Sequence, residues 1–235
     1  MKRFIIAFLC LTLFFSCDEL KEVVNQLPQT GGVLSNTDIA AGLREALDLG
    51  IDKQVTKLTQ EDGFFKNELV KIVLPEELQK VDTALRKIGL SSLADEGLKV
   101  LNRAAEDAVK EATPIFVSAV SEITFDDAKN ILLGEDNAAT SYLTTKTETA
   151  LYDKFKPVIE NSFSKVGADQ IWTNLITKYN NIPLTNNVNP DLTDYVTGEA
   201  LKGVYTMIAV EEKEIRTKVS SRGTELLQKV FALQD

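Results

Sequence analysis

The chain has 235 residues, of which 44% are apolar, and a formal net charge of -9. It can therefore bury a sizeable core, but it is a poor ligand for nucleic acid, whose binding is led by neutralisation of phosphates. It has no histidine, and its two cysteines, Cys10 and Cys17, both lie near the N-terminus. We expect no cofactor, because Cys/His zinc sites, conventional haem or iron–sulfur ligation and histidine-dependent nucleophiles are excluded from the body of the chain.

The first 16 residues have the features of a secretory signal peptide. Lys2 and Arg3 precede an apolar run from Phe4 to Phe15. This run is too short for a membrane-spanning helix, which needs about 20 residues. We therefore exclude residues 1–16 from the folded domain.

Ser16-Cys17 directly follows the apolar run and resembles a bacterial lipobox, although Phe14 stands where an aliphatic residue is usual. We expect Cys17 to be acylated, so that residues 17–36 tether a domain to the outside of a bacterial membrane, the outer membrane being favoured. The alternative is an ordinary signal peptide with an incidental cysteine. Cleavage would remove Lys2 and Arg3 and change the net charge from -9 to -11.

The apolar spacing of the remaining chain is helical. A stripe recurring about every four residues predicts a helix from Thr37 to Leu58, and Asp62-Gly63 marks a turn. Residues 71–74 are too few to assign and could be extended. Pro75 and Gly89 fit the two ends of the next helix. A helix over 91–113 follows, and its alanine-rich face predicts the close approach of another helix.

Further helices are expected over 114–123, after a Thr124/Asp127 capping box, over 137–166 with an interruption at Pro157, and over 168–179. Long and short helices are expected over 192–219 and 224–233. The Asn-rich segment 180–190 is the best boundary. We predict an all-α, compact, bundle-like domain over 37–235, with 37–180 and 190–235 as alternative halves.

Two sets of polar residues stand out. Glu211, Glu212 and Arg216 belong to a charge run that we interpret as a solvated helix face. Asn102 and Glu106 lie one turn apart beside the alanine-rich stripe, where polar groups must be paired or wet. We predict that they meet polar groups of another helix, with Arg216 as the candidate cation and Arg103 pointing further out. They form either a strut between helices or the polar wall of a ligand pocket.

Several separate motifs, in order along the chain, resemble the bacterial envelope proteins grouped as domain of unknown function 4197. They cover about 34–231 and include Gly42-Leu43-Arg44-Glu45-Ala46-Leu47, Leu101-Asn102-Arg103-Ala104-Ala105-Glu106, Ile131-Leu132-Leu133-Gly134 and Glu211-Glu212 with Ile215-Arg216. The resemblance implies a helical, exported, often lipidated protein. It implies no catalytic residues.

Three functions fit these patterns. The first is a non-catalytic envelope protein that binds a small apolar ligand or a partner protein. The second is a purely structural or assembly lipoprotein whose acidic surface meets a basic partner. The third is a carboxylate-based hydrolase. A pocket would favour the first, a flat apolar patch the second, and two facing buried carboxylates the third.

Overall fold

The computed structural model describes residues 34–74, 91–168 and 191–233, with isolated positions in the two intervening segments. These residues form helices and no strand. The elements are α2 (Asn36–Leu58), α4 (Ser91–Val109), α5 (Ala112–Ser121), α6 (Phe125–Leu132), α7 (Ala138–Ser164), α9 (Leu192–Thr217), the 3-10 turn η1 (Val219–Ser221) and α10 (Glu225–Phe231). The predicted all-α fold class is confirmed.

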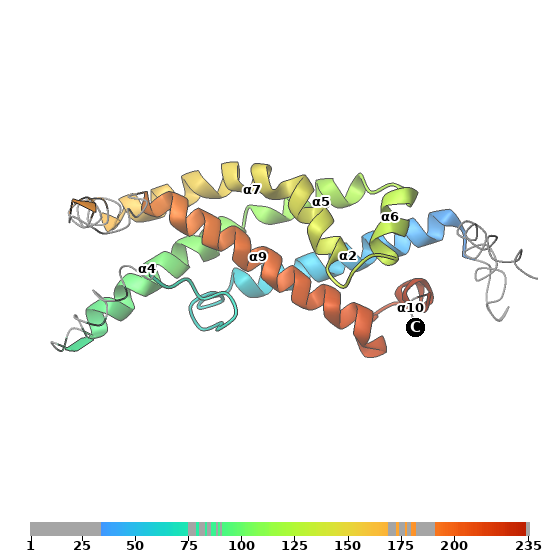
Figure 1. The fold of residues 1–235 in the computed structure, drawn as a ribbon, viewed down its shortest axis with the longest axis horizontal. Coiled ribbons are helices and arrows are strands. Elements are labelled where there is room, and N and C mark those ends of the chain that lie inside the picture. Colours follow the sequence, from blue (N-terminus) through green and yellow to red (C-terminus); the bar gives the residue numbers. More distant parts are fainter. Residues whose placement is uncertain are drawn as a thin grey trace, which may run out of the picture.

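The long helices run along the long axis of an elongated molecule (Figure 1). Helices α7 and α9 lie side by side and antiparallel: Glu212 near the end of α9 contacts Ala139 at the start of α7, and Tyr152 of α7 contacts Asp194 at the start of α9. Helix α9 also packs against α2 and α4, and α10 returns to pack on α2. One apolar core therefore includes residues from α2 to α10.

Side chains that satisfy free backbone N–H groups fix several helix starts. The predicted capping box of α6 is present: the Thr124 hydroxyl accepts from the Asp127 amide at 3.1 Å, and the Asp127 carboxylate accepts from the Thr124 amide at 3.0 Å. Ser35 and Asp38 cap α2 in the same way. Helix α9 begins after Asp191, whose carboxylate accepts from the Asp194 amide.

The predicted apolar faces are the buried ones. In α2, the buried stripe includes Leu43, Leu47, Ile51, Val55 and Leu58. The small residues of α4 allow close packing against α7 and α9, as the alanine spacing indicated. The buried small residues there are Ala104, Ala105 and Ala108.

Two boundary predictions were wrong. Helix α7 continues through Pro157 without ending. Phe155 and Ile159, which lie two residues to either side of Pro157, are fully buried. Their packing outweighs the loss of the backbone hydrogen bond that proline cannot donate. The helix predicted over 91–113 ends at Val109, and α5 begins two residues before Pro114.

The signal peptide and Cys17, and most of the predicted segments 75–89, 168–179 and 180–190, lie outside the described residues.

Candidate functional site: a groove between α7 and α9

Asn102 is fully buried and holds a loop against α4. Its side-chain oxygen accepts from the Ile72 amide at 2.8 Å, and its nitrogen donates to the carbonyl oxygens of Ile72 at 2.8 Å and Leu98 at 2.7 Å. The side chain thus pairs with Ile72 as a neighbouring strand would. It satisfies backbone groups of a segment, 59–74, that has no helix to satisfy them.

Glu106, 3% exposed, fixes the same loop one turn further along α4. Its carboxylate accepts from the Phe64 amide at 3.1 Å and from Arg103 at 3.1 Å. The prediction that Arg216 is the cation for Asn102 and Glu106 was wrong. Arg103 lies further out than these two residues, as predicted, but it is the cation that pairs with Glu106. Arg103 also reaches Glu61 and Asp62 of the loop, so it binds the loop to α4 from the solvent side. The prediction that Asn102 and Glu106 meet polar groups of another helix was also wrong, because both hold the non-helical 59–74 loop against α4. They act as a strut between a helix and a loop, and no described cavity is lined by Glu106.

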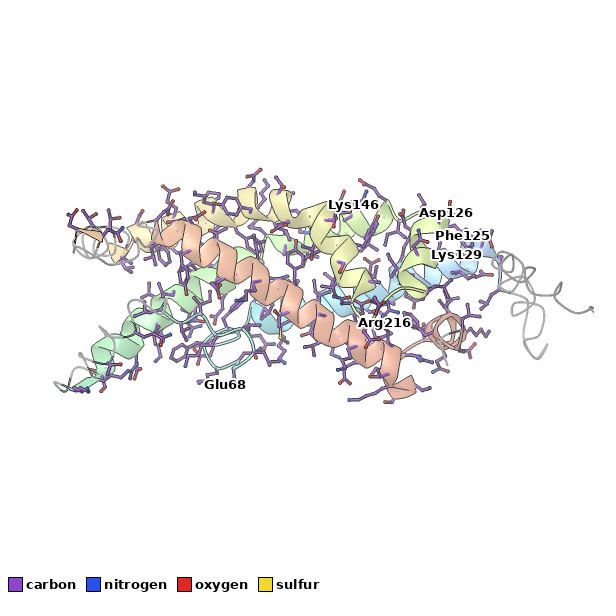
Figure 2. All side chains as sticks on the ribbon, in the orientation of Figure 1. Glu68, Phe125, Asp126, Lys129, Lys146 and Arg216 are labelled. Atoms are coloured by element: carbon purple, nitrogen blue, oxygen red, sulfur yellow. The ribbon has the colours of Figure 1, made fainter. Side chains whose placement is uncertain are left out.

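Arg216 instead lies where α9 passes the α6–α7 junction (Figure 2). Its guanidinium donates to Glu212 at 2.7 and 3.0 Å and to the Ile131 carbonyl, at the end of α6, at 2.9 Å. Glu212 accepts from the amides of Ala139 and Thr140 at 2.9 and 2.8 Å. The positive side chain therefore meets a helix C-terminus and the negative one a helix N-terminus, which is the favourable arrangement for both helix dipoles.

Glu211 is also buried, so the prediction that this charge run is a solvated face was wrong for both glutamates and for Arg216. Lys53 and Gln54 of α2 donate to Glu211 at 2.7 and 2.6 Å. The two adjacent carboxylates thus point to different helices, and each is engaged by donors. A cavity beside them has a volume of about 20 Å³, space for roughly one water molecule.

A larger hollow lies on the surface between α7 and α9. This groove has a volume of about 480 Å³ and is open to solvent. Its lining residues are Glu148, Thr149, Tyr152, Gly198, Leu201, Lys202 and Tyr205. On α9 these residues recur at helical spacing, so one continuous face of that helix forms the floor. The volume is within the range of small-molecule sites, roughly 300–1,000 Å³.

Two tyrosines cross the groove in opposite directions. Tyr152 of α7 donates to the Asp194 carboxylate of α9. The Tyr205 hydroxyl of α9 lies 2.8 Å from the Thr147 hydroxyl of α7. Because the Thr147 hydroxyl donates to the Leu143 carbonyl, Tyr205 is the donor of this bond. The ring of Tyr205 is supported from below by Phe116, edge to face, with ring centroids 6.1 Å apart.

Both phenols are neutral at physiological pH. The hydrogen bond to Asp194 raises the pKa of Tyr152, and burial raises the pKa of Tyr205 to about 12. Lys156, one turn after Tyr152, donates to its hydroxyl at 3.3 Å, and this bond raises the pKa of Lys156. The tyrosines are therefore fixed donors and apolar ring surfaces, and they are poor general bases.

Gly198 leaves the backbone of α9 bare within the groove. No described residue lies within 4 Å of the place where its Cβ would be. Gly203, five residues along the same helix, differs: a Cβ there would lie 2.6 Å from the buried ring of Phe64. Packing explains the second glycine. The first is exposed in a helix interior, where glycine costs about 1 kcal/mol relative to alanine.

The described residues offer no group of three or more acidic, histidine or cysteine side chains placed to hold a metal ion. None of the helices described is long and apolar enough to cross a membrane.

Sequence reasoning did not find the groove. Its lining residues on α7 and α9 are about 50 positions apart in the sequence, and only the packing of α7 on α9 brings them together. A usable signal was present in Gly198, a glycine inside a long predicted helix, since an exposed interior glycine calls for a reason.

The fold and the site thus define an all-helical protein with a solvent-open surface groove and a buried ion pair that contacts the ends of two further helices. Residues 33–232 match the family described as "Protein of unknown function (DUF4197)", and the chain belongs to that family. No curated protein and no solved structure matches the chain.

Proposed function

We propose that this protein is a non-catalytic, lipid-anchored protein of the bacterial cell envelope that binds a small ligand in the α7–α9 groove. The observation that supports this function is the groove itself, which combines a continuous helix face, two oriented tyrosine rings and a bare glycine. Concave sites with an apolar floor and a few fixed polar groups are the usual form of ligand sites.

The engagement of the buried charges supports a binding role over carboxylate catalysis. A hydrolase of that kind needs two facing carboxylates whose protons can move. Glu212 instead caps α7 and pairs with Arg216, and Glu211 accepts from Lys53 and Gln54. Each carboxylate is therefore held by donors of the protein itself, and the two do not face one another across a substrate site.

A purely structural or assembly role would be favoured by one broad apolar patch. The exposed large apolar side chains of the described chain are spread instead over α2, the 59–74 loop, α5, the ends of α6 and α7, α9 and η1. They are Leu49, Leu69, Val73, Val117, Leu133, Val166, Val210 and Val219. Single exposed residues of this kind are normal on a soluble surface. The groove is therefore the stronger feature.

The anchor at Cys17 places this binding domain on the outside of a bacterial membrane, with the outer membrane favoured. The support is the cationic start, the short apolar run and Ser16-Cys17. Fatty-acid labelling of cells tests the anchor: the wild-type chain should take up label and Cys17→Ser should not. A Cys17→Ser chain that keeps its label contradicts the anchor.

Binding is tested with a mixed library of neutral, cationic and anionic fragments and the mature chain, residues 17–235. Ligand-observed NMR should detect fragments whose signal is lost in Gly198→Leu, which fills the groove. The matched control is Gly97→Leu, since Gly97 is another exposed helix-interior glycine with no described neighbour within 4 Å. If no fragment distinguishes the two variants, the groove is not a binding site.

A further inference from the structure

The charges at the groove are unbalanced. Six charged side chains line the groove or are linked to its lining residues by hydrogen bonds and ion pairs. The acidic ones are Glu148, Asp191, Asp194 and Glu199, and the basic ones are Lys156 and Lys202. Lys156 lies 3.5 Å from Asp191, and Lys202 lies 3.5 Å from Glu199. Glu148 has no ion-pair partner among the described residues, so its negative charge in the groove is not balanced by a neighbouring cation.

Glu148 is the acidic residue with the most freedom to meet a ligand. It is exposed on α7 and lines the groove, and no described cation lies within ion-pair distance of it. Its charge also acts on the groove, because it contributes to the raised pKa of Tyr205. A cation entering the groove would therefore find an available carboxylate and would displace no existing ion pair.

The tyrosine rings favour the same sign of charge. The protein's own ammonium group, that of Lys156, already lies beside Tyr152: its Nζ donates to the hydroxyl at 3.3 Å and is 5.6 Å from the ring centroid. A cation within about 6 Å of an aromatic face is attracted by the ring quadrupole. A ligand ammonium near Tyr205 would gain this attraction and that of Glu148 together.

We infer that the groove binds an organic cation, with a flat or slender apolar body and an ammonium or guanidinium group. The apolar body would lie on Leu201 and the bare backbone at Gly198, and the charged group would lie toward Glu148. This inference rests on the proposed function and names its ligand class. It also agrees with the acidic character of the whole chain, which draws cations toward its surface.

The test uses two probes that share a benzene ring and differ in charge. Benzyltrimethylammonium carries the cation and benzenesulfonate the anion, and their dissociation constants for the mature chain are measured by NMR titration. The cation should bind at least about fivefold more tightly at low salt, because one cation–π contact and one exposed carboxylate each contribute about 0.5–1 kcal/mol. This preference should shrink at high salt.

Glu148→Gln should weaken binding of the cation by about two- to fivefold and leave benzenesulfonate no weaker. The matched control is Glu160→Gln, which removes the same charge from an exposed position further along α7 and outside the groove. Gly198→Leu should abolish binding without lowering the melting temperature, since leucine is the better helix former.

A cation preference that Glu148→Gln removes and Glu160→Gln retains supports the inference. It is overturned if benzenesulfonate binds equally well or better, if the two glutamine variants behave alike, or if neither probe binds. In these cases the proposed function still stands when other fragments respond to Gly198→Leu, and it fails with the inference when none does.

Discussion

One carboxylate oxygen of Glu212 accepts two hydrogen bonds from Arg216, at 3.0 Å from Nε and at 2.7 Å from Nη2, and the two side chains are only 6% and 7% exposed. The other oxygen accepts from Thr140 at the start of α7. Three helices therefore meet through one ion pair, and loss of either partner would leave a buried charge uncompensated.

Glu212→Gln should lower the free energy of unfolding by roughly 3–5 kcal/mol, because it leaves the Arg216 charge buried without its partner. The measurement is the denaturant midpoint at constant m-value. Glu214→Gln is the control: its ion pair with Lys218 has the same spacing, but the side chains are 39% and 56% exposed. The control should change stability by less than about 1 kcal/mol. Equal shifts in the two variants would contradict a structural role for the buried pair.

Asn102→Ala should release the loop that precedes residue 75 from α4. It leaves the buried amide and carbonyl of Ile72 without partners, at roughly 1–3 kcal/mol for each buried group. Hydrogen exchange should become faster at the Ile72 amide, whereas exchange in α7 should be affected little. Asn130→Ala, at an exposed position of α6, should leave both unchanged. Unchanged protection at Ile72 in the Asn102 variant would show that the loop is held by other contacts.

These two sites show what the sequence could and could not predict. The burial of Asn102 and Glu106 followed from their place beside an alanine stripe, because helical periodicity defines which face is buried. Their partners did not follow, since they belong to a non-helical loop with no periodic pattern. The buried Glu212–Arg216 pair was mistaken for a solvated face because local charge alone does not show that two helix ends, of α6 and α7, converge on it.

The capping box of α6 should make a contribution to stability that depends on pH. Hydrogen bonds from Thr124 hold the pKa of Asp127 below its usual value of 3.8. A carboxyl whose pKa is lower in the folded state stabilises the fold above its unfolded pKa, and this contribution is lost as the pH falls through the folded pKa. Asp127→Asn should therefore be less stable than the wild type at pH 7, with the difference shrinking below about pH 4.

Thermal melts across this pH range measure the difference in stability. Asp126→Asn, in the same turn but outside the capping box, is the control. A difference that stays constant down to pH 2 would exclude an ionic origin.

The two glycines of α9 should respond to alanine in opposite directions. At Gly198 the added methyl group has no described neighbour within 4 Å, so the gain in helix propensity should raise stability by about 0.5–1 kcal/mol. At Gly203 the same group would lie 2.6 Å from the Phe64 ring, which is fully buried and cannot turn aside. Forcing that ring from its place should cost about 1–3 kcal/mol, more than the propensity gain. Urea unfolding of the two variants, compared with the wild type, measures both signs. If Gly203→Ala proves as stable as Gly198→Ala, then Phe64 does not require the close approach of α9. If Gly198→Ala is destabilising, that glycine serves the fold, and its exposure in the groove needs no ligand to explain it.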